Sequence, residues 1–434
     1  MSNGNVKKLS FYFVSFLLAI LAIEVGLQAI NGLAFLLRKK EVKNPLLLYH
    51  QDKNMANQIW QETWDALDHR EYTQFLGWAD KTYHSAYVNE DAATGRKTWN
   101  PAAPQGKELA KVYFFGGSAA WGVGARDDFT IPSDLSRLLN RQGPRFQVFN
   151  YGVPGYIFTQ GIIHLTLLLR EGHSPRYVIF YDGFNEMYAA HQHGIAGTVH
   201  NLFMTRERLK LRYRDVVWNG IEEAIRKYSM IYKAINRLHL LITKKEQTYQ
   251  EIAEKYSDEQ LRSLSRDIVD DYKKSIKLLD HLSKTYDFQY ICFWQPTMLT
   301  EDHLTKQESN IDIRGEDRAL KKLCIFADEY LQKEKIPHFY RLTGALNQRP
   351  ESVYLDVAHI SEKGNEIIAG KIYEHLQKDF FANRQVSRGS KAPAPPGSDI
   401  GVFPGAATGR ATGPVPAIAA KCGVNGELDK VIRP

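Results

Sequence analysis

Short apolar runs alternate with amphipathic stretches through the central part of the chain. The apolar runs are KVYFF at 111–115, FQVFN at 146–150, YVIFY at 177–181, QYICFW at 289–294 and a shorter one near 338–340. Apolar residues recur with helical spacing over about 131–141, 160–171, 313–334 and 361–376. Strands that are apolar on both faces and alternate with helices are typical of a parallel sheet covered on both sides. The pattern predicts an α/β fold with three layers, α/β/α, around a parallel central sheet.

The N-terminal region has a different pattern. Residues 11–23 are almost wholly apolar, and the apolar run continues to Leu37 with a few polar interruptions. A bilayer core of about 30 Å needs about 20 residues of helix, and this segment is long enough to supply them. No A-x-A cleavage site follows the run, so residues 1–40 are predicted to be an uncleaved membrane anchor. A cleaved signal peptide and a buried helix of a soluble core are the alternatives.

The remaining segments set the domain organisation. Residues 41–106 mix aromatic residues with Pro and Gly breaks and are expected to form a lead-in segment that packs on the main domain at 107–381. That domain has a helical insertion at about 195–286, between the third and fourth predicted strands. Residues 382–434 are rich in Pro, Gly, Ala and Ser, a composition that predicts a disordered tail.

Composition excludes several classes of protein. With 434 residues and 44% hydrophobic side chains, the chain can bury a large core. Cys292, Cys324 and Cys422 are too few and too scattered for a disulfide framework or a CxxC zinc site. The net charge of +7 comes mainly from residues 201–245, which contain eleven Lys/Arg and four Asp/Glu. No nucleic-acid-binding motif accompanies this basic segment, so nucleic acid is not an expected partner.

Polar residues follow three of the predicted strands, where ligands bind in open parallel sheets. Ser118 follows the first strand, Gly155 the second and Asn185 the third, while Asp356 and His359 precede the last predicted helix. A serine hydroxyl becomes a nucleophile when an imidazole takes its proton, and a carboxylate fixes the tautomer of that imidazole. A glycine N–H and an asparagine amide are suitable donors to an oxyanion. Each of these residues could instead cap a helix or lie in a turn.

Four motifs in this order resemble those of the SGNH (GDSL-like) hydrolase superfamily. They are FFGGSAAWG around Ser118, NYGVPGY around Gly155, YDGFNE around Asn185, and DVAH at Asp356–His359. The resemblance implies that Ser118 is the nucleophile, His359 the base and Asp356 the residue that orients it. It also implies an oxyanion hole formed by the N–H groups of Ser118 and Gly155 and the side chain of Asn185.

The resemblance covers about 111–376 apart from the insertion, and the chain departs from the family pattern at two places. The usual GDS is GGS here, and the usual GxND is GFNE, with Glu186 in the last position. Neither change affects a residue with a direct catalytic role, but both set the chain apart from the lipase-like subgroup. The membrane-anchored bacterial members found with cell-surface polysaccharide genes are the more similar type, with the SGNH/flavodoxin-like fold.

The function implied is an acyl-ester hydrolase that forms an acyl-Ser118 intermediate, with an O-acetyl ester of a carbohydrate as the expected substrate. An O-acyltransferase, a phosphoester or thioester hydrolase, and a non-catalytic subunit of a polysaccharide assembly system are the alternatives. The polysaccharide interpretation places the domain outside the cytoplasmic membrane. The charges that flank the apolar run, two lysines before it and Arg38, Lys39 and Lys40 after it, favour the opposite orientation.

No cofactor or metal is expected. His191 and His193 could suggest a metal site, but no third ligand is evident in the sequence, and a solvated loop is the simpler interpretation. The basic insertion has three interpretations, namely a solvated helix face, a surface that lies on an anionic membrane, and a binding site for an acidic glycan. Residues 230–242 mix apolar and basic side chains in an amphipathic pattern.

Overall fold

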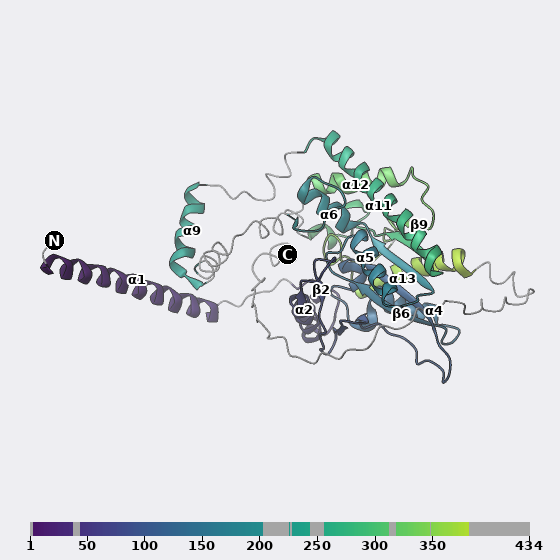
Figure 1. Ribbon diagram of the computed structural model, residues 1–434, viewed down its shortest axis with the longest axis horizontal. Coiled ribbons are helices and arrows are strands. Elements are labelled where there is room, and N and C mark those ends of the chain that lie inside the picture. The colour runs from purple at the N-terminus through teal and green to yellow at the C-terminus, as the bar shows by residue number, and fades with distance from the viewer. Residues whose placement is uncertain are drawn as a thin grey trace, which may run out of the picture.

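The computed structural model describes residues 3–37, 44–202, 225, 228–243, 256–311, 318–347 and 349–381. The tail predicted at 382–434, with Cys422, lies outside the described residues, as do 203–224 and 244–255 of the predicted insertion. Figure 1 shows a layered α/β body, with two helices, α1 (Asn3–Leu37) and α9 (Met230–Thr243), beside each other and outside that body.

A central sheet of five parallel strands forms the body of the described chain. The strands are β5 (Ala110–Gly116), β6 (Phe146–Gly152), β7 (Tyr177–Asp182), β8 (Gln289–Trp294) and β9 (Phe339–Arg341). They lie in the order β6-β5-β7-β8-β9, so β5, the first along the chain, lies between β6 and β7, and the chain winds outward in both directions from it. This doubly wound order and the parallel pairing confirm the predicted fold class.

Two short antiparallel strands extend the sheet beyond β6. They are β3 (Glu90–Asp91) and β4 (Gly95–Arg96), and β4 pairs with β6 through Arg96 and Asn150. A separate hairpin joins β1 (Arg70–Glu71) to β2 (Ala79–Asp80). The sequence pattern predicted no strands here, because a strand of two residues is too short to show a period of two. The lead-in segment therefore contributes strands to the main sheet.

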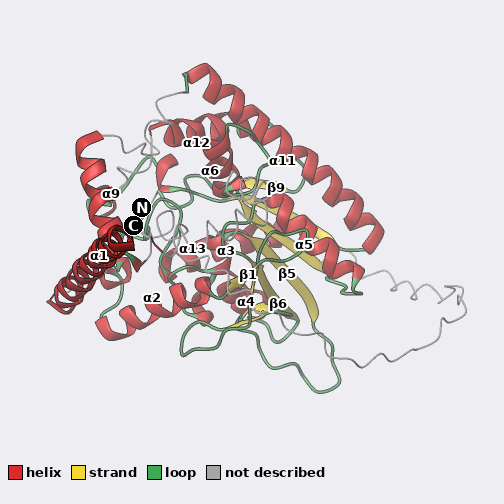
Figure 2. Ribbon diagram, turned by 60° about the vertical axis from the view of Figure 1, so that its left-hand side comes forward, coloured by secondary structure: helices red, strands yellow, loops and turns green. Residues whose placement is uncertain are grey.

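Helices cover both faces of the sheet (Figure 2). One layer contains α3 (Ser118–Trp121), α4 (Ile131–Leu139) and α13 (Glu362–Leu376), and the other contains α5 (Phe158–Arg170), α6 (Phe184–His193), α11 (Asp258–Tyr286) and α12 (Arg318–Leu331). The helices predicted by periodicity thus form, with ends that differ by a few residues. A turn of π-helix, η5 (Gln377–Phe381), follows α13.

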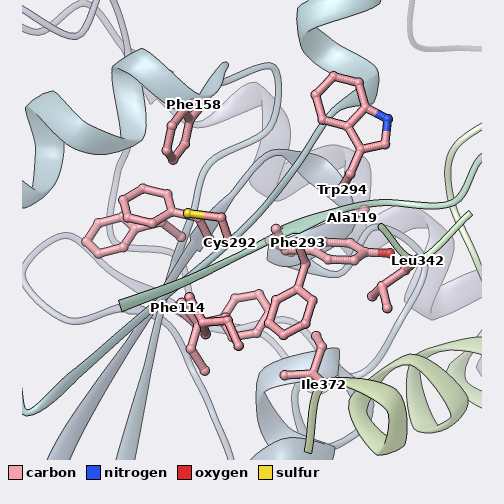
Figure 3. Close-up of a cluster of buried hydrophobic side chains, with 14 of the residues drawn as sticks. Phe114, Ala119, Phe158, Cys292, Phe293, Trp294, Leu342 and Ile372 are labelled. Carbon is pink, nitrogen blue, oxygen red and sulfur yellow. The ribbon is translucent and has the colours of Figure 1, made fainter. Parts of the chain in front are cut away.

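Alternate side chains of each central strand enter the two layers. On β8, Cys292 and Trp294 point to the side of the sheet on which Phe158 of α5 lies, and Phe293 points to the opposite side, toward Ile372 of α13 (Figure 3). These residues are at most 2% exposed, and the ring of Phe158 stacks on Tyr272 at 4.1 Å between centroids. Burial on both faces explains why the strands are continuous apolar runs in the sequence.

The lead-in segment packs on the body through a small apolar cluster. After a 3-10 turn, η1 (Pro45–Leu48), helix α2 (Lys53–Asp68) is capped by Asp52, whose side chain accepts hydrogen bonds from the first turn. Leu46 and Trp60 pack with Leu355, the residue before Asp356. The remaining 3-10 turns are η2 (Asp127–Phe129), η3 (Met298–Thr300) and η4 (Glu308–Asn310).

Helix α1 is the one helix of the described residues that is long and apolar enough to cross a bilayer. The qualifying segment is Phe11–Gly32, of 22 residues with a mean hydropathy of 2.2, and none of it is buried in the protein. Large apolar side chains along it, such as Phe11, Leu18 and Ile30, are about two-thirds exposed. A surface of this kind is stable in lipid and costly in water.

Candidate active site

The polar residues singled out in the sequence meet at the carboxyl ends of the central strands. Ser118 begins α3 directly after β5, Gly155 lies in the loop after β6, and Asn185 is in the first turn of α6 after β7. The chain reverses its winding direction between β6 and β7, with β5 between them. This is the point of a doubly wound sheet at which loops separate and a ligand can enter.

Ser118, His359 and Asp356 form a continuous hydrogen-bonded chain. His359 Nε2 lies 2.7 Å from Ser118 Oγ, and His359 Nδ1 lies 2.6 Å from Asp356 Oδ2. The side chain of His359 is 14% exposed, so the imidazole is mostly buried but still reaches the surface. With Nδ1–H donated to Asp356, Nε2 is the acceptor for the serine proton, which is the arrangement required of a general base.

Asp356 is held as a carboxylate. Its Oδ1 accepts hydrogen bonds from the backbone N–H groups of Ala358 at 2.9 Å and His359 at 2.8 Å. Burial tends to raise the pKa of Asp356, but the charge of His359 and these hydrogen bonds outweigh it and hold the pKa below its usual range. The negative charge is therefore available to stabilise an imidazolium at His359.

A closed loop fixes the aspartate and the histidine relative to each other. Leu355 N donates to His359 O at 2.9 Å, and Tyr354 and Ile360 form an antiparallel bridge across the base of the loop. Ser361 then caps α13 by accepting a hydrogen bond from Gly364 N. The antiparallel bridge and the helix cap thus fix the short loop on which Asp356 and His359 lie three residues apart.

The asparagine and glycine motifs meet beside Ser118. The side chain of Asn185 lies against Gly117, where a Cβ would be 2.1 Å from Asn185 Nδ2. The same nitrogen donates to the carbonyl of Tyr156 at 2.7 Å, and an amide nitrogen has a second N–H that can serve an oxyanion. Gly155 adopts a left-handed conformation, with φ of +86°, that a side chain would strain.

Glu186, the residue that departs from the family pattern, connects two of these motifs. Its carboxylate accepts from Gly183 N at 2.8 Å and from Phe158 N at 2.5 Å, and so ties the start of α6 to the start of α5. Burial raises the pKa of Glu186 despite these hydrogen bonds, and burial with the charge of Glu186 raises the pKa of neighbouring Asp182 well above its usual range. Glu186 is therefore a positioning residue for the turns that hold Asn185 and Gly155.

The β1–β2 hairpin supports the glycine motif from outside, a contact that the sequence pattern did not reveal. Trp78 Nε1 donates to the carbonyl of Pro154 at 3.0 Å, and Arg70 Nη1 donates to the same carbonyl at 3.2 Å. The indole of Trp78 also covers Gly155, at 3.1 Å from the position of a Cβ. The two residues lie some 80 positions before the loop they hold, so no local signal could have identified them.

Buried charges lie under the helix that begins at Ser118. Trp121 Nε1 donates to Glu90 Oε1 at 3.2 Å, and the guanidinium of Arg96 lies 4.1 Å from the centroid of the Trp121 ring. Arg96 Nε also pairs with Asp127 at 2.9 Å. Burial and the neighbouring Asp80 raise the pKa of Glu90 to about 9, so Glu90 is protonated at neutral pH. The strands of the lead-in segment therefore anchor the helix that contains the serine.

Two ion pairs hold the segment that contains Asp356 and His359. Glu308 is fully buried, pairs with Arg349 Nη2 at 2.6 Å and accepts from the N–H groups of Val353 at 2.8 Å and Tyr354 at 3.0 Å. After His359, Glu362 pairs with Arg126 through both carboxylate oxygens, at 2.8 and 2.6 Å. The loop is thus fixed on both sides by charge-assisted hydrogen bonds.

The histidine pair considered as a metal site lies in the last turn of α6. His191 is buried, and His193 Nε2 accepts a hydrogen bond from the backbone N–H of Leu202 at 3.2 Å. The pair therefore belongs to a helix and not to the solvated loop that was the simpler interpretation of the sequence. In the part of the chain that the structure describes, no three His, Cys, Asp or Glu side chains are grouped as metal ligands would be.

No protein-family model and no curated protein matches the sequence. Among solved structures, the chain is similar to the acetyl xylan esterase AlAXEase, with 12% identity, 61% of this chain and 99% of that chain covered, and a TM-score of 0.33. It is similar to a lipolytic protein of the G-D-S-L family from Veillonella parvula DSM 2008, with 12% identity, 63% and 98% covered, and a TM-score of 0.31. A third is the lipase/acylhydrolase from Enterococcus faecalis, with 14% identity, 62% and 96% covered, and a TM-score of 0.32. These three solved structures are thus an esterase and lipolytic or acyl-hydrolysing proteins.

Proposed function

We propose that the chain is a serine-dependent acyl-ester hydrolase of the SGNH type. The observation that supports this most is the position of His359, whose two ring nitrogens contact Ser118 at 2.7 Å and Asp356 at 2.6 Å. A serine that only caps a short helix does not need a histidine within hydrogen-bond distance, nor a histidine held in turn by a carboxylate. The arrangement suits acyl transfer through a covalent intermediate.

The reaction follows from these contacts. Ser118 Oγ attacks the ester carbonyl while His359 Nε2 takes the hydroxyl proton, and Asp356 stabilises the imidazolium that results. The oxyanion of the tetrahedral intermediate accepts hydrogen bonds from the N–H groups of Ser118 and Gly155 and from Asn185 Nδ2. The intermediate collapses as His359 returns the proton to the leaving alcohol, which yields the acyl-Ser118 ester. Water then attacks the acyl-enzyme by the same steps, releases the acid and restores Ser118.

The substrate proposed is an acyl ester, in particular an O-acetyl ester of a carbohydrate. This part rests on the resemblance of the sequence motifs to the membrane-anchored bacterial members of the superfamily. If a sugar hydroxyl replaces water in the second step, the same residues catalyse O-acyl transfer instead of hydrolysis. The intact contacts among Ser118, His359 and Asp356 argue against a non-catalytic subunit, because a site without turnover has no need to keep them.

We further propose that α1 is retained as a single membrane anchor, with the α/β body outside the cytoplasmic membrane. Its apolar, exposed segment Phe11–Gly32 supports a membrane location, and the contacts of Glu24 with α9 support retention, because a cleaved signal peptide would leave α9 without them. The outside orientation follows from the expected polysaccharide substrate and opposes the flanking charges. Protease protection of the body in right-side-out membrane vesicles would refute that orientation.

The test of the catalytic proposal uses the detergent-solubilised full chain with a fluorophosphonate probe and with p-nitrophenyl acetate. Wild type should be labelled and should turn over the ester, and Ser118→Ala should do neither. Ser263→Ala, which alters an exposed serine on α11, is the matched control and should behave as wild type. A folded wild-type protein that is neither labelled nor active would refute the hydrolase proposal. Adding candidate sugars as acceptors would distinguish transfer from hydrolysis.

A further inference from the structure

Helix α1 has a polar site within its apolar span. Glu24 and Gln28 are one helical turn apart, and Gln28 Nε2 donates to Glu24 Oε1 at 3.0 Å. Glu24 lies eight residues before Gly32, which places it about 12 Å along the helix axis from that end of the span. A charged group at this depth is costly unless protein groups satisfy it, and such residues in membrane helices usually have a functional partner.

The N-terminus of α9 satisfies Glu24. The carboxylate accepts hydrogen bonds from Met230 N at 2.5 Å, from Ile231 N at 3.0 Å and from Ser229 Oγ at 2.9 Å. Gln28 also donates to the carbonyl of Tyr228. The first N–H groups of a helix have no partner within it and attract a negative charge, so the two helices complement each other at this contact. The polar face of α1 is therefore a docking site for α9.

The N-terminal end of α9 meets α1, and the rest of α9 rises away from α1 in both views (Figures 1 and 2). Its sequence, MIYKAINRLHLLIT, groups apolar residues on one face at helical spacing, among them Ile231 and Ile235. Ile235 is 62% exposed, so the structure leaves this apolar side chain uncovered by protein. Lys233 and Arg237, also exposed, are one turn apart on a different face.

We propose that α9 is an in-plane membrane helix, docked on α1 through Glu24 and seated in the leaflet next to the α/β body, with its apolar face in the acyl chains. This inference rests on the proposal that α1 spans the membrane. Amphipathic helices lie 5–10 Å into the boundary between headgroups and acyl chains. A contact about 12 Å along α1 reaches that depth when α1 is tilted.

Lipid is the occupant favoured for the exposed face, because that face continues the apolar surface of α1. The two helices contact each other, and exposed side chains of both are large and apolar near the contact, including Leu21, one turn before Glu24 on α1, and Tyr228 and Ile235 at α9. Lys233 and Arg237 are suited to the phosphates of anionic headgroups. The insertion then gives the α/β body a second membrane attachment, which would hold the site at a fixed height over the bilayer.

The experiment measures the depth of single labels in the full-length protein, reconstituted in vesicles of phosphatidylethanolamine and phosphatidylglycerol. Cys422→Ser removes the thiol of the C-terminal segment, and Cys292 and Cys324 are buried. An environment-sensitive fluorophore is placed at Ile235→Cys of α9, at Ile20→Cys of α1, and at Leu278→Cys, an exposed apolar position of α11. Quenching is compared between a nitroxide on the lipid chains and iodide in the buffer.

The expected result is that lipid nitroxide quenches the labels at 20 and 235 several-fold more than the label at 278, and that iodide shows the reverse order. If the label at 20 is not quenched by lipid, the anchor itself is wrong. If lipid nitroxide quenches the label at position 20 but not the label at position 235, α1 spans the bilayer but the proposal for α9 is overturned. Shielding of 235 from both quenchers would indicate a protein partner or a second copy of the chain, and would also overturn it.

A pair of substitutions at Glu24 tests the docking contact separately. Glu24→Lys places a cation at the N-terminus of α9 and should release the label at 235 to iodide while the label at 20 stays in lipid. Glu24→Gln keeps an oxygen acceptor of the same length and should retain lipid quenching at 235. An unchanged label at 235 in Glu24→Lys would refute docking through Glu24. Thermal unfolding of the α/β body should be unaffected in both variants.

Discussion

Gly117 and Asn185 approach each other so closely that no side chain larger than hydrogen fits between them. A Cβ at Gly117 would lie 2.1 Å from Asn185 Nδ2, and 3.3 Å from the carbonyl of Tyr156 to which that nitrogen donates. The residue before the proposed nucleophile and the proposed oxyanion donor are therefore positioned by one contact. In the GGS sequence here, Gly117 stands where the usual GDS of the family has Asp, and this contact leaves no room for a side chain at that position.

Gly117→Ala is expected to displace Asn185 and to lower kcat toward p-nitrophenyl acetate. Backbone atoms of β5 and α3 cannot move as easily as a side chain, so the side-chain amide of Asn185 should shift and no longer point at the oxyanion. Steady-state kinetics with thermal unfolding measure the effect. Gly370→Ala on α13 is the matched control, because Gly370, like Gly117, has no left-handed φ, but no heavy atom lies within 4 Å of its Cβ position. Wild-type kcat in Gly117→Ala would contradict the positioning of Asn185.

Asn185→Ala is expected to lower kcat by about 10²–10³-fold with little change in KM, because the amide contributes mainly to the charged transition state. The measurement is steady-state hydrolysis of p-nitrophenyl acetate. Labelling of Ser118 by a fluorophosphonate should slow as well, since that reaction forms a similar oxyanion. A change confined to KM would assign Asn185 to substrate binding instead.

Asp356→Asn is expected to lower kcat by about 10⁴-fold while the protein remains folded. The amide can hydrogen-bond to His359 with the wrong tautomer, which leaves Nε2 protonated and unable to accept the proton of Ser118. The loss should be largest near neutral pH and should shrink at high pH, where hydroxide can act as the base. Activity profiles of both proteins between pH 6 and 10 would show it, and equal profiles would argue against Asp356 as the orienting group.

Glu308→Gln is expected to destabilise the protein near neutral pH and to remove part of its acid sensitivity. Burial alone would raise the pKa of Glu308, but Arg349 and the backbone donors lower it from 4.5 to about 2. A group with a lowered pKa in the folded state stabilises the protein above the pKa of its unfolded state and loses that contribution as pH falls. In urea unfolding at pH 6, the free energy of unfolding should therefore be higher for wild type than for the variant. This difference should narrow from pH 4.5 toward pH 2. A difference in the free energy of unfolding that did not change with pH would show that the charge of Glu308 does not contribute.

Glu90→Gln should have the opposite pH dependence. Burial and Asp80 raise the pKa of Glu90 from 4.5 to about 9, so the folded protein binds a proton that the unfolded chain releases. Stability from such a group is fully present below pH 4.5 and declines through the window up to pH 9, with a slope of about 1.4 kcal/mol per pH unit. The variant, which cannot ionise, should lose less stability than wild type between pH 6 and 9. If the free energies of unfolding of the two proteins declined in parallel with pH, Glu90 would not be protonated in the folded state.

The sequence alone was sufficient for the layers of the fold and for the residues proposed to react. Strands buried on both faces must be apolar throughout, so β5 to β8 were visible as runs, and the turns after them identified Ser118, Gly155 and Asn185. Asp356 and His359 could also be paired from the sequence, because they are three residues apart on one short loop before Ser361, the N-cap of α13. Local patterns predict local structure because the forces involved act between near neighbours in the chain.

Only the tertiary structure decided which distant residues support that site. Trp78 and Arg70 hold the carbonyl of Pro154, and Glu24 binds the N-terminus of α9 across more than 200 residues. Contacts of this kind depend on where folding places two segments, and neither segment has a periodicity or composition that reveals its partner. Glu186, in the first turn of helix α6, differs from the family pattern, and its two hydrogen bonds show that it links the start of α6 to the start of α5. Sequence determines what each segment can do, whereas long-range packing determines which segments meet.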